Sequence, residues 1–236
     1  GVLLSGHGED FKILACRTAE SDPDQQNDQP LAEQIVKQIE AEKLTFDEIS
    51  VAVDCEMFTQ HNLHSEFSEY RQIANTIRFD AEEAVAMDTS ELAVAFNINA
   101  ITETGSEVTV YTANRELMTE TLTTMLKKGI DPTAIEPDIV CLARFIEKSK
   151  SLSSPKDRIT VITGEKACYL IMPSDGHNQP FVRSFLITPS QNLTDTLARE
   201  IPITVASFSS QEPVTSIAGA GKAENIDTEK LAEKTG

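Results

Sequence analysis

The segment RITVITGEKACYLIM, residues 158–172, decides the fold class of this chain. Its two apolar runs, Ile159–Ile162 and Ala167–Met172, flank a short turn that contains Gly164, which predicts two adjacent strands. A third apolar run at Phe181–Ile187 predicts a third strand. Three strands in close succession indicate the start of a sheet.

The order of elements continues with helices on the C-terminal side of this segment. Ser190 is the expected N-cap of a helix that carries Leu193 and Leu197 on one face. A strand is predicted at Pro213–Ile217, and Asp227 is the expected N-cap of a last helix.

The N-terminal half shows a similar order. Apolar runs at 2–4 and 11–16 predict a hairpin, the apolar spacing after Pro30 predicts a helix, Ile49–Val53 predicts a strand, and 67–84 predicts a long helix. Two halves with the order hairpin, helix, strand, helix indicate an internal duplication.

A small α/β segment lies inside the first half. Strands are predicted at Leu92–Ile98 and Val108–Ala113, followed by a helix that ends at Gly129 and by a further helix from about 139 to 146. The predicted fold is α/β, with two duplicated domains and an inserted subdomain.

The predicted domain boundaries follow from this order. The first domain is expected at 1–79 and 136–150, the inserted subdomain at 80–135 and the second domain at 157–236. The polar stretch 148–156 is the expected linker.

The charge of the chain excludes some partners. The sequence has 38 acidic and 20 basic residues, a formal net charge of −18. A field of that sign repels nucleic acid and anionic membrane surfaces. We also find no apolar run of about 18 residues that would span a bilayer, so no nucleic acid and no direct membrane insertion are expected.

The four cysteines indicate a reducing setting. They lie far apart without a CxxC pair, and no charged segment precedes an apolar signal region, so a cytoplasmic protein is expected. The chain starts at Gly1, which is consistent with a fragment.

Two segments resemble a known family. IRFDAEEAVAMD at 77–88, and VYTANREL at 110–117 running into KGIDPTAIEPD at 128–138, resemble PilM, the type IV pilus assembly protein, and its type II secretion relative GspL. This resemblance implies the actin-like (ribonuclease H-like) fold, with the first strand missing before Gly1 and the C-terminal part of the second domain truncated.

The resemblance also implies where ATP with Mg²⁺ would bind. The first phosphate motif is not in this chain, and the second corresponds to VITGEK at 161–166, with Gly164 in place. Ile162 occupies the position of the family's Asp, and an aliphatic side chain cannot orient water or Mg²⁺. Glu165 is a weak substitute, so no catalytic residue is assigned and turnover is doubtful.

The family's adenosine-binding turn corresponds to Ile217–Gly221, so Gly219, Ala220 and Gly221 join Gly164 as the expected nucleotide-binding residues. Small residues let a ligand approach the backbone. Any α/β protein can use glycine in such a turn, and this structural explanation is favoured.

Two polar clusters have residue types that suit a site, but a structural explanation is favoured for each. His61 and His64, with Glu66 near, have a spacing that suits a metal, but a surface loop is favoured. Asp54 and Glu56 follow a predicted strand, and a polar loop is favoured there too. No metal site is assigned.

An acidic run lies at the end of the predicted long helix: Asp80, Glu82, Glu83, Asp88 and Glu91. The resemblance implies a groove beside the inserted subdomain that receives the cytoplasmic tail of a PilN-type inner-membrane protein. An acidic rim suits a tail that is followed by basic residues.

Three hypotheses follow. The first is a cytoplasmic adaptor that docks on the inner-membrane platform of a type IV pilus or type II secretion machine, with a degenerate nucleotide site and self-association left open. The second is an active actin-like ATPase or a sugar-kinase relative. The third is an interaction domain that binds no nucleotide.

Overall fold

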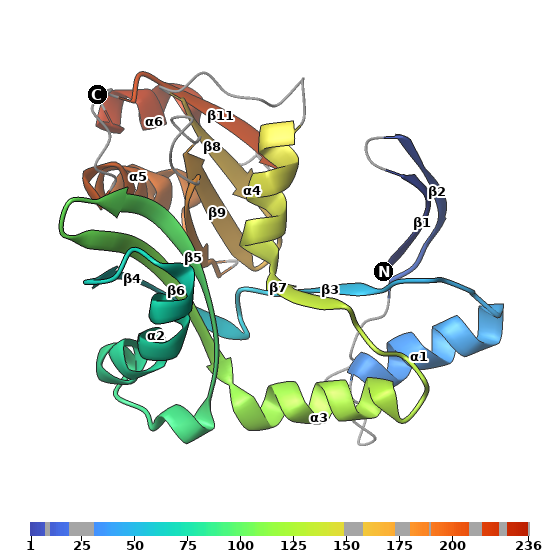
Figure 1. The fold of residues 1–236 in the computed structure, drawn as a ribbon. Helices are drawn as coiled ribbons and strands as arrows, with labels where there is room; N and C mark the ends of the chain where they lie inside the picture. The colour runs from blue at the N-terminus through green and yellow to red at the C-terminus, as the bar shows by residue number, and fades with distance from the viewer. Residues whose placement is uncertain are drawn as a thin grey trace. The chain divides into compact units, whose positions relative to one another are not determined.

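A computed structural model describes residues 1–7, 10–18, 31–148, 158–172, 180–188, 190–207, 214–221 and 226–235 (Figure 1). The chain divides into two compact units. The first contains Gly1–Val51 and Arg115–Ile135, and the second contains Ala52–Asn114 and Glu136–Gly236. The chain passes between the units within two strands that pair with each other, β3 (Ser50–Val53) and β7 (Ala134–Pro137).

The first unit contains the predicted hairpin and two helices. Strands β1 (Val2–His7) and β2 (Asp10–Cys16) pair antiparallel, and α1 (Leu31–Glu42) and α3 (Arg115–Leu126) follow the predicted amphipathic patterns. Burial of apolar side chains from both helices and the loops after them forms the core. Its members are Val36, Ile39, Phe46, Ile49, Val51, Met125 and Ile130.

Helix α3 ends as the sequence predicts. Gly129 has φ +75°, a left-handed conformation that glycine adopts without strain. The N–H of Ile130 donates to the carbonyl of Met125, five residues earlier, over 3.1 Å. This is the hydrogen bond of a Schellman motif that spans six residues. Gly129 therefore ends the helix.

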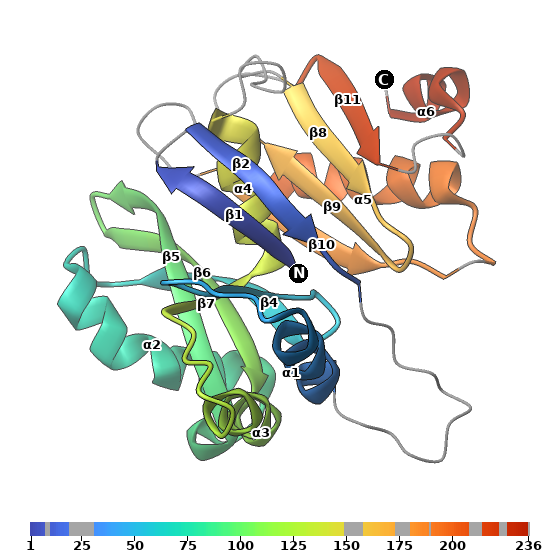
Figure 2. The same cartoon turned by 90° about the vertical axis from the view of Figure 1, so that its right-hand side faces the viewer.

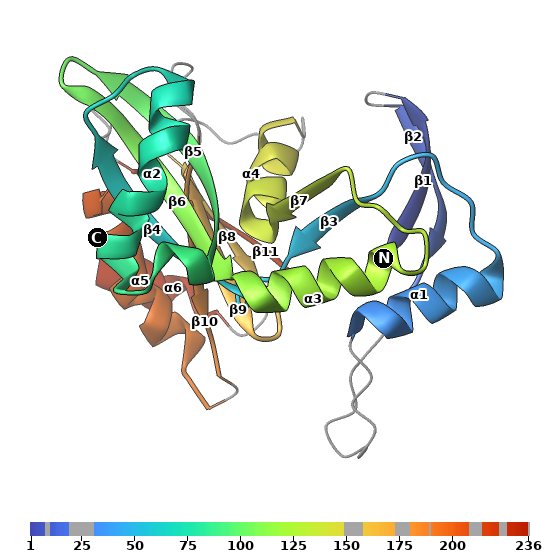
Figure 3. The ribbon, with the colours of Figure 1, turned by 60° about the horizontal axis from the view of Figure 1, so that its bottom comes forward.

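The second unit contains a three-stranded antiparallel sheet in the order β4-β6-β5, made of β4 (Phe58–Ser65), β6 (Gly105–Asn114) and β5 (Leu92–Thr102). Helix α2 (Tyr70–Val85) packs on one face of this sheet (Figure 3), and the short helix η1 (Thr89–Glu91) leads into β5. The predicted surface loop around His61 and His64 is wrong, because both residues lie in β4.

The second sheet of this unit has the order β10-β9-β8-β11 (Figure 2). Strands β8 (Arg158–Thr163), β9 (Ala167–Met172) and β10 (Phe181–Leu186) are antiparallel neighbours, whereas β11 (Ser216–Gly221) runs parallel to β8. The first three strands were predicted.

Helices cover the second sheet. Helices α5 (Leu193–Ser207) and α6 (Thr228–Thr235) pack on one face through Leu197, Ile201 and Leu231. The strand residues in this core are Ile159, Val161, Cys168, Leu170, Met172 and Phe181. Because strand residues alternate between faces, the residues between these point to the other face.

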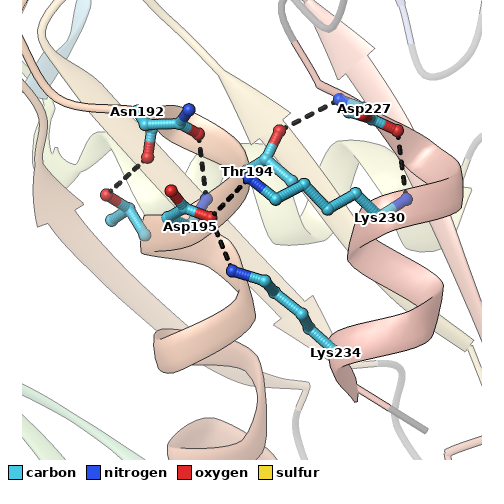
Figure 4. Close-up of polar contacts among 7 residues, drawn as sticks. Asn192, Thr194, Asp195, Asp227, Lys230 and Lys234 are labelled. Carbon is cyan, nitrogen blue, oxygen red and sulfur yellow. Dashed lines mark hydrogen bonds and ion pairs between the residues drawn. The ribbon is translucent and has the colours of Figure 1, made fainter.

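The beginnings of α5 and α6 are joined by polar contacts (Figure 4). Asn192, not the predicted Ser190, caps α5, since its Oδ1 accepts from the N–H of Asp195 over 3.1 Å. Asp227 caps α6 as predicted, because its Oδ1 accepts from the N–H of Lys230 over 3.0 Å. The N–H of Asp227 donates to Oγ1 of Thr194 over 3.0 Å and so ties one helix to the other.

The predicted domain division stays a prediction. Its boundary at residue 80 falls inside α2, and its boundary at 135 coincides with a passage between the two units. The first domain's last residues, 149–150, and all but the first residue of the expected linker 148–156 lie outside the described residues. The same holds for Pro213, the first residue of the predicted strand Pro213–Ile217. Among the helices that the structure describes, none combines the length and apolar character needed to cross a bilayer.

Candidate functional site

The ends of β8 and β11 bring the two predicted nucleotide-binding segments together. The strands are parallel, and Thr163 at the end of β8 pairs with Gly221 at the end of β11. Gly164 follows Thr163 directly, and its N–H donates to the carbonyl of Ala167 over 2.8 Å. Ligands of α/β proteins bind at the carboxyl ends of parallel strands. This edge is therefore a candidate ligand site.

Gly221 is required by the packing of the two strands. Its φ is +80°, and a Cβ at this position would lie 2.3 Å from the carbonyl oxygen of Thr163. A side chain therefore cannot fit without moving β8. The same two strands are also joined by a side-chain hydrogen bond, in which the hydroxyl of Thr163 donates to the carbonyl of Ala220 over 3.2 Å. The close approach of the strands explains this glycine without a ligand.

The predicted turn at Ile217–Gly221 is wrong, because these residues form most of strand β11. Pairing with β8 satisfies the alternate N–H and C=O groups of this strand that face β8, which outweighs the low strand preference of glycine. Gly219 and Gly221 are exposed, and Ala220 is half-buried. Their contact with a nucleotide, like that of Gly164, stays a prediction.

Ile162 lies in a row of three residues across the sheet. It pairs with Ala220 on β11 and with Tyr169 on β9, and this row points away from α5 and α6. The position that the resemblance matches to the family's Asp thus holds a half-buried aliphatic side chain. Glu165, the weak substitute, is exposed in the turn between β8 and β9.

A carboxylate reaches this face of the sheet from another element. Asp138 is the first residue of helix α4 (Asp138–Lys148), and its Oδ2 accepts a hydrogen bond from the Tyr169 hydroxyl over 2.5 Å. Burial raises the pKa of Asp138, while hydrogen bonds from Tyr169 and from the backbone of Ile139 and Cys55 oppose that rise. Burial and the neighbouring carboxylate raise the pKa of Tyr169.

Cys55 completes this buried polar group. Its side chain is 7% exposed, and burial raises the pKa of the thiol to about 11, against a smaller opposing effect of its hydrogen bond with Tyr169. A thiol with so high a pKa stays protonated at neutral pH and is a poor nucleophile. The group formed by Cys55, Asp138 and Tyr169 therefore serves as a buried hydrogen-bond network.

The neighbouring residues Asp54 and Glu56 form a polar loop, as favoured from the sequence. Oδ1 of Asp54 accepts from the N–H of Glu56 over 2.9 Å, which is the geometry of an Asx turn. The Glu56 carboxylate lies 3.7 Å from Nζ of Lys166 in the turn after β8. Both side chains of this ion pair are largely exposed, so its contribution is small.

The sequence indicated neither Asp138 nor Tyr169 as a site residue. An acid at the first position of a helix is common, because it stabilises the helix N-terminus. The one available signal was Tyr169 itself, a hydroxyl in the otherwise apolar run Ala167–Met172, since a buried tyrosine hydroxyl usually has a partner.

The histidines of β4 make local contacts. Nδ1 of His64 lies 2.8 Å from Oε1 of Glu107, its cross-strand partner, and this contact raises the pKa of His64. His61 contacts the hydroxyl of Thr59 at 3.2 Å. Within the described ranges, no group of three or more His, Cys, Asp or Glu residues is placed to hold a metal ion.

The acidic run lies on α2 and around η1. Glu83, Asp88 and Glu91 are exposed, and Asp88 caps η1 through the N–H of Ser90 at 2.7 Å. Partial burial and the charges of Glu83 and Glu66 raise the pKa of Asp80. Two apolar side chains of the same segment are also exposed, Phe79 at 64% and Met87 at 36%.

The repeated order of hairpin, helix and strand, with the candidate site at the ends of parallel strands, defines an α/β protein with the actin-like ATPase fold. A chain of the PilM-PilN type IV pilus biogenesis complex shares the fold with a TM-score of 0.68 and 15% identity, covering 99% of this chain and 82% of that chain. The cytoplasmic domain of EpsL, an inner membrane component of the type II secretion system of Vibrio cholerae, matches with a TM-score of 0.56 and 10% identity over 98% of this chain and 87% of that chain.

A third structure, a Bacteroides thetaiotaomicron protein with an actin-like ATPase fold and unknown function, matches with a TM-score of 0.51 and 12% identity over 95% of this chain and 77% of that chain. The chain belongs to the type II secretion system (T2SS) protein L family, whose model matches residues 25–165. No curated protein sequence matches it. The resemblance to PilM and GspL and the predicted fold class are thus confirmed.

Proposed function

We propose that this chain is a cytoplasmic adaptor that docks on the inner-membrane platform of a type II secretion or type IV pilus machine. Its membership of the protein L family carries the proposal. The adaptor reaches the membrane through a PilN-type partner, since one fold neighbour is a chain of a PilM-PilN complex. Its work is binding, and it stays peripheral to the membrane.

The partner's tail binds beside the acidic run of α2 and η1. Exposed carboxylates at Glu83, Asp88 and Glu91 attract the basic residues that follow a cytoplasmic tail at the membrane. The exposed Phe79 and Met87 offer apolar contacts for the tail itself.

The test is binding of a labelled tail peptide from a PilN-type partner, measured by fluorescence anisotropy at low salt. The double variant Glu83→Lys, Glu91→Lys should bind at least about tenfold more weakly, because two attractive charges become repulsive. Glu229→Lys with Glu233→Lys on α6 makes the same change of net charge elsewhere. Equal affinity of the two double variants would contradict this binding surface.

The candidate nucleotide site is degenerate. The residues at the β8–β11 edge suit a phosphate group of ATP but do not suit its Mg²⁺ ion. The absence of large side chains at Gly164 and along β11 would let a phosphate approach the backbone, whereas Ile162 cannot hold Mg²⁺ or water. Nucleotide, if it binds, is therefore a structural or regulatory ligand of the adaptor.

A calorimetric titration of Mg²⁺ and ATP into the full-length protein, with phosphate release assayed on the same sample, tests this site. Binding without turnover is the expected result. Steady turnover of ATP would contradict the adaptor hypothesis and support the alternative, an active actin-like ATPase or sugar-kinase relative. Absence of binding would leave an interaction domain without a nucleotide. In the double variant Ile162→Asp, Asp138→Asn, which avoids two carboxylates on one face, no gain of phosphate release would count against the assignment of position 162.

A further inference from the structure

Strand β6 carries a buried tyrosine whose hydroxyl is not satisfied by the protein. Tyr111 is 4% exposed, and its hydroxyl has no hydrogen-bond partner among the residues that the structure describes. Its neighbour Val110 packs against α2, so Tyr111 points to the opposite face of the three-stranded sheet. A buried hydroxyl without a partner costs free energy, and native proteins rarely leave one. The hydroxyl therefore indicates a bound polar group.

Gln60 of β4 presents a second unsatisfied atom on the same face of the sheet. Gln60 and Tyr111 are direct cross-strand partners. Nε2 of Gln60 donates to the carbonyl of Val182 on β10. Because a carbonyl can only accept, this contact fixes the orientation of the amide and directs Oε1 away from that carbonyl. Oε1 is buried and, within the described part of the chain, also lacks a partner.

The chemistry of these two groups limits what can bind between them. A tyrosine hydroxyl can donate one hydrogen bond and accept others, whereas Oε1 of Gln60 can only accept. A cation would leave the hydrogen of the hydroxyl without an acceptor, and an anion would be repelled by Oε1. A small neutral group that both accepts and donates satisfies both atoms, and water is the smallest such group.

Asn97 of β5 supplies a third polar group. It pairs with Thr109, two residues before Tyr111, and so lies on the same face. Its amide is close enough to the Tyr111 hydroxyl to oppose in part the rise of the tyrosine pKa that burial causes, but it does not form a hydrogen bond with it. Buried waters have about three hydrogen-bond partners each. The side chains of Tyr111, Gln60 and Asn97 can supply them.

We propose that a buried water molecule binds between Tyr111 and Gln60, with Asn97 as its third contact. The water accepts a hydrogen bond from the Tyr111 hydroxyl and donates one to Oε1 of Gln60. Since Nε2 of Gln60 binds the carbonyl of Val182, the water continues a polar connection from β6 through β4 to β10, the edge strand of the second sheet. It thereby helps to hold the two sheets of the second unit together.

Magnetic relaxation dispersion of the water nuclei counts the long-lived buried waters of the full chain in solution. Tyr111→Phe and Gln60→Met should each lose about one such water, and the double variant should lose no more than either single variant, because both side chains hold the same molecule. Tyr70→Phe makes the same chemical change at a tyrosine that is 63% exposed, and it should leave the count unchanged.

A crystal structure of the wild-type chain tests the position of the water. The expected result is density for a water within about 2.6–3.2 Å of both the Tyr111 hydroxyl oxygen and Oε1 of Gln60. A direct hydrogen bond between Tyr111 and Gln60, or a position without density, would overturn the proposal. So would a Tyr111→Phe variant that keeps the full count of long-lived waters, or losses in the two single variants that add up in the double variant.

Discussion

The hydroxyl of Tyr169 on β9 donates a 2.5 Å hydrogen bond to Oδ2 of Asp138 at the start of α4. Tyr169 is 7% exposed and pairs in the sheet with Ile162, the residue that the resemblance matches to the family's Asp. The contact thus fixes the beginning of a helix against the same face of the sheet on which a catalytic carboxylate would be expected.

Breaking this hydrogen bond should destabilise the fold. Tyr169→Phe leaves the partly buried carboxylate of Asp138 without its donor, and we expect a loss of about 1–3 kcal/mol in the free energy of unfolding. Urea unfolding of Tyr169→Phe, Asp138→Asn and the double variant gives the coupling energy of the pair. Tyr70→Phe, at an exposed tyrosine, should change stability little. A coupling energy near zero would contradict the assigned role.

Asp138 should also make stability depend on pH. Its folded-state pKa is raised above the ordinary value of 3.8 by burial, so the folded state holds the proton more tightly than the unfolded state. This stabilisation is complete below 3.8 and is lost as pH rises through the folded-state pKa. Asp138→Asn lacks the titration, so its stability deficit relative to wild type should shrink as pH rises through that window. Urea unfolding at several pH values checks this, and a constant deficit would refute it.

The close approach of β11 to β8 predicts a difference between two glycines. Gly221 and Gly129 both have positive φ, but a Cβ at 221 meets the Thr163 carbonyl at 2.3 Å, whereas one at 129 meets nothing within 4 Å. Gly129→Ala should cost about 1–2 kcal/mol, the penalty of the left-handed conformation alone. Gly221→Ala should cost clearly more. Thermal or urea unfolding compares them, and equal losses would show that β11 can move away from β8.

The contact between α5 and α6 should depend on Thr194 more than on Asp195. Thr194→Val leaves the N–H of Asp227 without its acceptor beside a buried position, for a loss of about 1–3 kcal/mol. Asp195 binds Lys230 and Lys234 at 3.1 and 2.8 Å, but at an exposed site, so Asp195→Asn should have a smaller effect that vanishes in high salt (Figure 4). Hydrogen exchange of α6 amides measures both. Faster exchange of α6 amides in Asp195→Asn than in Thr194→Val would contradict this prediction.

The sequence predicted most elements where one face is strongly apolar. The hairpins, the helices and strands β8, β9 and β10 of the second sheet follow from that pattern, whereas β11 overlaps the predicted strand only at Ser216 and Ile217. Strand β4 was missed because its two apolar residues, Phe58 and Leu63, are five apart and so fall on opposite faces. Its pairing with β6 is supported by polar contacts that periodicity cannot show, such as Thr59 with Thr112 at 2.7 Å.

The closeness of Gly164 and Gly221 follows from the resemblance, whereas their contact with a nucleotide stays a prediction. The resemblance placed Gly164 and Gly221 in one site, and the parallel pairing of β8 and β11 does bring them side by side. The contact between Asp138 and Tyr169 was not predictable, because it joins residues 31 apart through the packing of α4 on the sheet. Helix packing of this kind leaves no local pattern in the sequence.

The row formed by Ala220, Ile162 and Tyr169 limits what a single substitution at position 162 can achieve. Asp at this position would place a second carboxylate on the face where Tyr169 already holds that of Asp138, and two acids on one poorly hydrated face disfavour each other's ionisation. An ionised acid can therefore be introduced there only together with a change of Asp138, and the hydrogen bond that stabilises the start of α4 would be lost with it.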